Sequence, residues 1–99
     1  MKKIVLFCGA GMSSSLLVLK IRDAAKEIGY ECKVEAFSST SANYAKDADI
    51  VLIGPQIRFH LKDLQKELPC PVAVIDDKAY GSMNGVMVLA QARKIMKDE

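Results

Sequence analysis

The stretch that decides the fold joins an apolar run to a helical pattern through small residues, and it reads Phe7-Cys8-Gly9-Ala10-Gly11-Met12-Ser13-Ser14-Ser15. An apolar run, a glycine-containing loop and then serines predict a strand, a loop and the start of a helix. The first turn of a helix has four backbone N–H groups without intrahelical acceptors, and its dipole is positive at that end. A glycine-containing loop that leads into such a turn therefore predicts an anion site, above all for phosphate.

Cys8 lies at the mouth of this expected anion site. The groups that bind phosphate also stabilise a thiolate, so we expect the pKa of Cys8 to lie below that of free cysteine. A nucleophile beside a phosphate site predicts a covalent phosphocysteine. The phosphate-binding residues that we expect are Gly9, Ala10, Gly11, Met12, Ser13, Ser14 and Ser15. The alternative is that Cys8 is a small buried residue at a strand end and that the serines only cap a helix.

Length and composition limit the remaining possibilities. The 99 residues predict one domain spanning 1–99, and the hydrophobic content of 51% predicts a compact fold. With 14 basic and 12 acidic residues, the charge is too balanced to favour a nucleic-acid partner. No apolar run is long enough to span a membrane, and the three cysteines lack metal-ligand spacing. We therefore expect a soluble, cytoplasmic monomer with reduced thiols and without metal or cofactor.

The first half of the chain predicts two strands around a long helix. Residues Lys3 to Cys8 are a continuous apolar run, which is typical of a strand buried on both faces of a parallel sheet. A helix is expected from a cap at Ser13, Ser14 or Ser15 to about Ile28, with Gly29 as its stop signal. Its expected core side is Leu17, Ile21, Ala24 and Ile28. From Tyr30 to Phe37, apolar and charged residues alternate, which favours a sheet edge.

The second half predicts two more strand and helix pairs. Residues Ser38 to Ala48 are polar and predict at most two helical turns, capped by Ser39, Thr40 or Ser41. The expected strands are Asp49 to Ile53 and Val72 to Ile75. After Gly54-Pro55 one amphipathic helix is expected, with Ile57, Leu61, Leu64 and Leu68 on its apolar side. Lys78 to Met83 is expected to be a loop, and Asn84 to cap a last helix with Val88, Leu89, Ala92, Ile95 and Met96 on its core side.

Strand and helix alternate four times, which predicts an α/β fold. We expect a four-stranded parallel sheet in the order 2-1-3-4 with helices on both faces, because the charged second strand belongs at an edge. In that order the winding reverses between the first and third strands, where doubly wound sheets bind ligands. The Cys8 loop and Gly54-Pro55 would meet there, so the fold and the motif predict the same site.

One residue type is missing from the loop. The low-molecular-weight tyrosine phosphatases and arsenate reductases use a Cys-x5-Arg loop on a similar fold, and the residue at that position is Ser14 here. A positioned arginine in phosphoryl transfer supplies about 10³–10⁵ in rate. Its absence favours a loop that holds a phosphoryl group for delivery over one that hydrolyses it. A small phosphatase or arsenate reductase remains the alternative enzyme, and a non-covalent anion-binding domain the alternative without catalysis.

The chain resembles a known family, the enzyme IIB component of the phosphoenolpyruvate-dependent sugar phosphotransferase system, lactose/cellobiose/chitobiose type. The resemblance covers nearly the whole chain, and it is carried by Leu6 to Leu17, by Asp49 to Ile57, and by Val74 to Gly81. It implies a phosphotransferase in which a IIA partner passes a phosphoryl group from phosphohistidine to Cys8. Cys8 then passes it to a disaccharide held by the membrane IIC component, so the protein would visit the inner face of the membrane. The resemblance does not identify the sugar.

Four residues outside the loop are candidates for further roles. His60 is interpreted as a partly packed residue within a helix and not as a second phosphoryl carrier. Asp76 and Asp77 are interpreted as turn or cap residues and not as a general acid. For Tyr80, contact with the phosphoryl group or a partner and ordinary packing are equally open. Met12 is expected at the crest of the loop, where it would form with Tyr80 a contact surface that both partners share.

Overall fold

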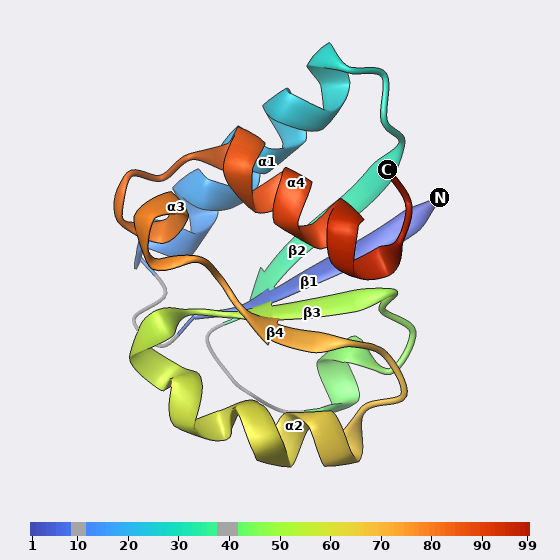
Figure 1. Ribbon diagram of the computed structural model, residues 1–99, viewed down its shortest axis with the longest axis vertical. Coiled ribbons are helices and arrows are strands. Elements are labelled where there is room, and N and C mark those ends of the chain that lie inside the picture. The colour runs from blue at the N-terminus through green and yellow to red at the C-terminus, as the bar shows by residue number, and fades with distance from the viewer. Residues whose placement is uncertain (9–11, 38–41) are drawn as a thin grey trace.

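The computed structural model describes residues 1–8, 12–37 and 42–99. Four strands form one all-parallel sheet in the order β2-β1-β3-β4, as predicted (Figure 1). The strands are β1 (Lys2–Phe7), β2 (Cys32–Phe37), β3 (Ile50–Ile53) and β4 (Val72–Val74). Ile4 to Phe7 and all of β3 are buried, because these two strands are central and covered on both faces. Strand β2 lies at an edge, as its alternating pattern predicted.

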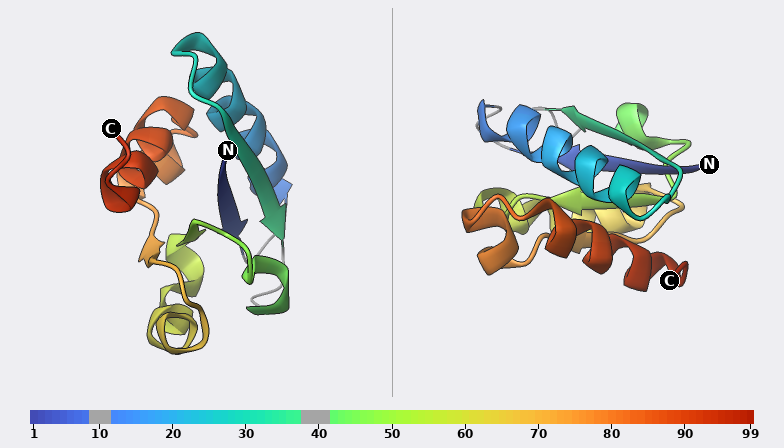
Figure 2. Two further views of the ribbon diagram at one scale, coloured as in Figure 1. Left: turned by 90° about the vertical axis from the view of Figure 1, so that its right-hand side faces the viewer. Right: turned by 90° about the horizontal axis from the view of Figure 1, so that it is seen from above.

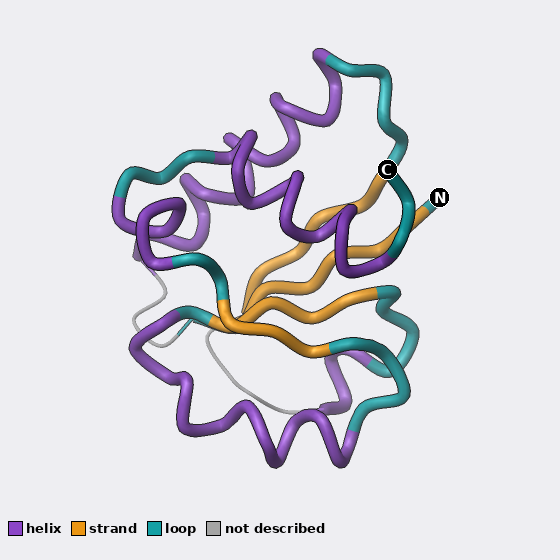
Figure 3. Tube along the Cα trace, viewed as in Figure 1, coloured by secondary structure: helices purple, strands orange, loops and turns teal. Residues whose placement is uncertain are grey.

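Helices cover both faces of the sheet, which was also predicted. One face carries α1 (Met12–Glu27), α3 (Asp77–Gly81) and α4 (Gly85–Met96) (Figures 1 and 2). The other face carries α2 (Leu61–Glu67) with the 3₁₀ helices η1 (Ala42–Ala45) and η2 (Pro55–His60). Successive strand residues alternate between the two cores, so Ile4 and Leu6 face α1 and α4 while Val5 and Phe7 face α2. Figure 3 shows the strands between these two helical layers.

Helix α1 buries most of its predicted core side. Leu17, Ile21 and Ala24 pack in the core, whereas Ile28 is 57% exposed and was wrongly assigned to it. The reason is that α1 ends at Glu27, one residue before Ile28. Gly29 then has φ +68°, a left-handed conformation that glycine adopts without strain, so the predicted stop signal is confirmed.

Two predictions in the second half are wrong in detail. The single helix expected after Gly54 is broken: η2 precedes α2, and Ile57 has non-helical angles of φ −117° and ψ 27°. The apolar residues still face one core, which is why their spacing resembled a continuous helix. The loop expected from Lys78 to Met83 contains α3, because the Asp76 side chain caps this short helix by accepting from the Ala79 N–H (3.1 Å).

Helix α4 begins as predicted. The Asn84 side chain accepts from the Met87 N–H (3.1 Å), and Val88, Leu89 and Ala92 are buried. At Gly85 the helix approaches α1 so closely that a Cβ atom there would lie 2.3 Å from the Lys20 carbonyl carbon and oxygen. The sequence analysis did not identify this approach.

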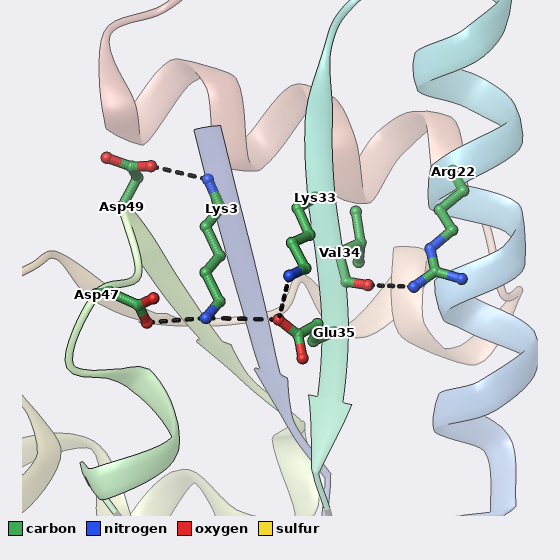
Figure 4. Close-up of polar contacts among 7 residues, drawn as sticks. All are labelled: Lys3, Arg22, Lys33, Val34, Glu35, Asp47 and Asp49. Carbon is green, nitrogen blue, oxygen red and sulfur yellow. Dashed lines mark hydrogen bonds and ion pairs between the residues drawn. The ribbon is translucent and has the colours of Figure 1, made fainter. Parts of the chain in front are cut away.

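Polar contacts tie the amino-terminal ends of the strands together (Figure 4). Lys3 Nζ lies 2.8 Å from Asp47 and 3.4 Å from Glu35, and the Lys3 N–H donates to Asp49 (2.7 Å). Arg22 joins α1 to β2 by donating to the Val34 carbonyl (2.7 Å).

Within residues 1–8, 12–37 and 42–99, no helix has the length and apolarity needed to cross a membrane.

Candidate functional site

Cys8 lies where backbone hydrogen bonds join the carboxyl ends of β1, β2 and β3. It directly follows β1, and its N–H donates to the Phe37 carbonyl at the end of β2 (3.1 Å). The Gly54 N–H at the end of β3 donates to the Phe7 carbonyl (2.8 Å). Cys8 therefore occupies the carboxyl ends of the strands at the point where the strand order reverses, which is where doubly wound sheets bind ligands.

The first turn of α1 faces the same end of the sheet. The helix begins at Met12, so the expectation that a serine at 13, 14 or 15 caps it is wrong, as is that of Met12 at a loop crest. The backbone N–H groups of Met12, Ser13 and Ser14 belong to the first turn, where a helix has no internal acceptors. Ser15 is exposed. The side chains of Met12, Ser13 and Ser14, and all of Gly9, Ala10 and Gly11, lie outside the described residues.

Tyr80 reaches Cys8 from helix α3. Its hydroxyl makes a hydrogen bond with the Cys8 thiol, and its ring packs against the core that contains Cys8. Helix α3 stands at the carboxyl ends of the strands (Figure 1), and Gln91 of α4 fixes the chain that leads into it. Gln91 accepts from the Asp76 N–H (3.0 Å) and donates to the Val74 carbonyl (2.8 Å). The structure therefore shows Tyr80 packed against the core and in contact with the Cys8 sulfur, while a contact with a phosphoryl group or a partner stays a prediction.

The environment of Cys8 differs from the expectation in one respect. Burial raises the pKa of the Cys8 thiol, and the hydrogen bond with Tyr80 opposes that effect without cancelling it. The predicted pKa below that of free cysteine is thus not found, because Cys8 is only 1% exposed and loses the water that stabilises a thiolate. The sequence indicated the backbone donors but not the depth of burial.

Asp76 and His60, two further candidates from the sequence, make contacts that support the fold. Asp76 caps α3, as interpreted from the sequence. His60 is half-buried at the junction of η2 and α2, not in the middle of a helix, and its ring centre lies 4.3 Å from that of Phe59. The signal that could have found α3, and with it Tyr80, was Asp76 itself, since aspartate is a preferred cap.

The fold and the site define the class, which is a doubly wound α/β protein with an enclosed cysteine at the carboxyl ends of its central strands. Comparison with protein families matches residues 3–91 to the family described as "PTS system, Lactose/Cellobiose specific IIB subunit". The chain belongs to this family, whose members are components of sugar phosphotransferases, so the resemblance found in the sequence is confirmed.

Individual relatives agree with this assignment. The chain is 43% identical over 103 residues to the oligo-beta-mannoside-specific EIIB component of Bacillus subtilis, with 100% of both chains covered. It is 36% identical to the galactose-specific EIIB component of Lactococcus lactis subsp. cremoris, with 96% of both covered. The solution structure of the cellobiose-specific IIB component from Borrelia burgdorferi superposes with a TM-score of 0.77 at 37% identity, covering 98% of this chain and 93% of that one.

Proposed function

We propose that this chain carries a phosphoryl group on Cys8 during sugar uptake. It accepts the group from phosphohistidine of a IIA protein or domain and transfers it to a disaccharide bound by the membrane IIC component. The observation that carries the proposal is the position of Cys8, which is enclosed at the end of β1 and lies four residues before Met12, where the first turn of α1 begins with N–H groups that have no intrahelical acceptors.

Each transfer exchanges one bond for another. In the first step the P–N bond of phosphohistidine breaks and an S–P bond forms on Cys8, while the thiol proton is taken up overall by the released histidine nitrogen. In the second step the S–P bond breaks, the sugar oxygen takes the phosphoryl group, and the hydroxyl proton returns overall to the sulfur. The backbone donors of Gly9 to Ser15 would bind the phosphoryl oxygens in both steps.

The sugar belongs to the class of cellobiose, chitobiose and lactose under this proposal. The relatives are named for oligo-beta-mannosides, galactose and cellobiose, so the class is better supported than any single sugar. In the second step the protein acts at the inner face of the membrane, because that is where it meets IIC.

Reconstituted transfer tests the proposal. With phosphoenolpyruvate, the general relay proteins, IIA and membranes containing IIC, the wild type should support phosphorylation of a disaccharide. Cys8→Ser should fold but abolish this transfer, because the phosphoryl carrier is lost. Cys32→Ser is the matched control, since Cys32 is a half-buried free cysteine away from the strand ends that hold Cys8, and it should keep the wild-type rate. Full activity of Cys8→Ser would contradict the proposal.

The hydrolase alternative has its own test. Because Ser14 replaces the arginine of the Cys-x5-Arg loop, the purified protein should show little multiple turnover of an aryl phosphate such as p-nitrophenyl phosphate. A Cys-x5-Arg phosphatase assayed in parallel is the positive control. Rapid turnover that is lost in Cys8→Ser would favour the phosphatase instead.

A further inference from the structure

Hydrogen bonds fix the chain both before and after Tyr80. Its helix, α3, is capped by Asp76, and Gln91 of α4 fixes the strand end that precedes it. The Tyr80 N–H donates to the Asp76 carbonyl (2.9 Å), and the Asn84 N–H that follows donates to the Ala79 carbonyl (2.9 Å). The half-buried ring is thus carried by a short but well-fastened helix and not by a free loop.

Gly54 provides the space that the Tyr80 ring occupies. A Cβ atom on Gly54 would lie 3.7 Å from both Cε1 and the hydroxyl oxygen of Tyr80, so the ring rests against the bare backbone at the end of β3. A larger side chain would need the volume that the ring fills. Gly54 has φ −65° and ψ 147°, which every residue adopts, so its backbone does not require glycine.

We propose that Tyr80 is a catalytic residue of the transfer, whose hydroxyl donates a hydrogen bond to the Cys8 sulfur while Gly54 keeps the ring in reach of it. The need for such a donor follows from the burial of Cys8. In a residue that is 1% exposed the thiol has lost most of its hydration, so a thiolate there depends on the donors that the protein supplies. The hydroxyl of Tyr80 is such a donor, and it meets the sulfur directly.

The role of Tyr80 rests on the proposed function of Cys8 as phosphoryl carrier. When the sulfur attacks the phosphorus of phosphohistidine, the thiol proton leaves and the Tyr80 hydroxyl stabilises the negative charge on the sulfur. In the onward step the sulfur is the leaving group, and the same hydrogen bond stabilises the charge that returns to it. Tyr80 keeps its own proton throughout, so the balance of either transfer is unchanged.

Titration of the Cys8 thiol, followed by the NMR chemical shift of its Cβ carbon against pH, tests the contact without any relay protein and without a reagent that must enter the fold. The background is Cys32→Ser with Cys70→Ser, so that Cys8 is the one thiol of the chain. Tyr80→Phe should move the titration midpoint of Cys8 upward by about one pH unit, because a hydrogen bond to a charged group is lost. Tyr44→Phe is the control, since it removes a hydroxyl from a half-exposed ring stacked on Phe37, and it should leave the midpoint unchanged.

Substitutions at Gly54 test the contact between Tyr80 and Cys8 by changing the space that the Tyr80 ring occupies. Gly54→Val should displace the Tyr80 ring and reproduce the upward shift. Gly54→Ala should have a smaller effect, because its Cβ would meet Tyr80 at an ordinary contact distance of 3.7 Å, and its nearest neighbour, at 3.1 Å, is the flexible end of the Gln56 side chain. If Tyr80→Phe does not fold, the Gly54 pair carries the test alone.

The transfer from phosphorylated IIA separates this inference from the proposed function. Tyr80→Phe should slow it by about tenfold near pH 7, with recovery as the pH rises, because one pKa unit is a factor of ten in thiolate. If Cys8 is phosphorylated and Tyr80→Phe changes neither the midpoint nor the rate, the inference is overturned while the carrier function stands. If no phosphoryl group reaches Cys8 in the wild type, the carrier function fails, and the catalytic role of Tyr80 fails with it even if the titration midpoint shifts.

Discussion

At the scale of single residues, the buried thiol of Cys8 links the site to the stability of the fold. Burial raises the pKa of Cys8, so the folded protein holds the thiol proton to a higher pH than the unfolded chain does. Above the unfolded pKa of about 8.5 the unfolded chain therefore binds fewer protons than the folded one, and the free energy of unfolding falls as the pH rises.

This predicts that Cys8→Ser loses less stability than the wild type between about pH 8 and about pH 10, because serine has no proton to release in that range. Urea unfolding followed by circular dichroism at several pH values measures the difference. Equal slopes for the two proteins would show that the Cys8 thiol has an ordinary pKa in the folded state.

Some residue roles could be predicted from the sequence and others could not. The caps at Asp76 and Asn84 follow from local chemistry, since their side chains bond N–H groups three residues away. The position of Cys8 follows from an apolar run that meets a glycine-containing loop. The contact of Cys8 with Tyr80 does not, because the two residues are far apart in the chain and meet only through α3 and α4. The direction of the pKa shift of Cys8 was predicted wrongly because it depends on burial. The burial of a residue is set by the assembled core and not by the neighbouring sequence.

At the scale of elements, the crossing of α1 and α4 depends on Gly85. A Cβ atom at this position would lie 2.3 Å from the Lys20 carbonyl group and 2.7 Å from the Ile21 nitrogen, and all three of these atoms belong to rigid helix backbone. The two helices would have to move apart, which would disturb the core between them.

Gly85→Ala should therefore lower the free energy of unfolding by about 1–3 kcal/mol, the usual effect of overpacking. Gly81→Ala is the matched control, because nothing lies within 4 Å of its Cβ position. The control should be neutral or stabilising by up to about 1 kcal/mol, since alanine restricts the unfolded chain. Urea denaturation of both variants decides the matter, and equal stabilities would show that the helices adjust without cost.

The break between η2 and α2 shows a limit of periodicity. Residues Ile57, Leu61, Leu64 and Leu68 have helical spacing, and all four pack in one core. The backbone nevertheless leaves the helical region at Ile57, whose N–H bonds back to the Gly54 carbonyl (3.0 Å) in a tight turn. Apolar spacing reports which residues face the core, but a 3₁₀ turn followed by an α-helix produces nearly the same spacing as one longer helix.

At the scale of the whole molecule, contacts at the end opposite Cys8 tie the last residues to the chain before β2. The Tyr30 hydroxyl donates to the Asp98 carboxylate (2.6 Å), and Arg93 lies 4.5 Å above the Tyr30 ring and donates to the Asp98 carbonyl (3.0 Å). Burial and the hydrogen bond to Asp98 raise the pKa of Tyr30. Its contribution to stability is therefore present below about pH 10 and is lost as the pH rises above that value.

Tyr30→Phe should lower the free energy of unfolding by about 1 kcal/mol at pH 7, because one hydrogen bond is lost. It should also reduce the loss of stability above about pH 10, since the titrating phenol is gone. Thermal unfolding at pH 7 and at alkaline pH measures both effects, with Tyr44→Phe as the comparison. A variant as stable as the wild type at pH 7 would show that the Tyr30–Asp98 contact does not stabilise the fold.

The topology of the molecule was predictable because each strand carries its own signal. Two continuous apolar runs indicate central strands, and the charged alternation around Lys33 and Glu35 indicates an edge. The order 2-1-3-4 then places Cys8 at the strand ends where the winding reverses. The sequence did not show two close approaches in the folded chain. One is between α1 and α4 at Gly85, and the other is between Gly54 and the Tyr80 ring.

The central claim is that Cys8 carries the phosphoryl group, and locating that group measures it most directly. The protein is incubated with phosphoenolpyruvate, the general relay proteins and IIA, digested at neutral pH, and mapped by tandem mass spectrometry. One phosphoryl group on the sulfur of Cys8, removed when disaccharide and IIC membranes are added, is the predicted result. A phosphoryl group on His60 and none on Cys8 would contradict the claim.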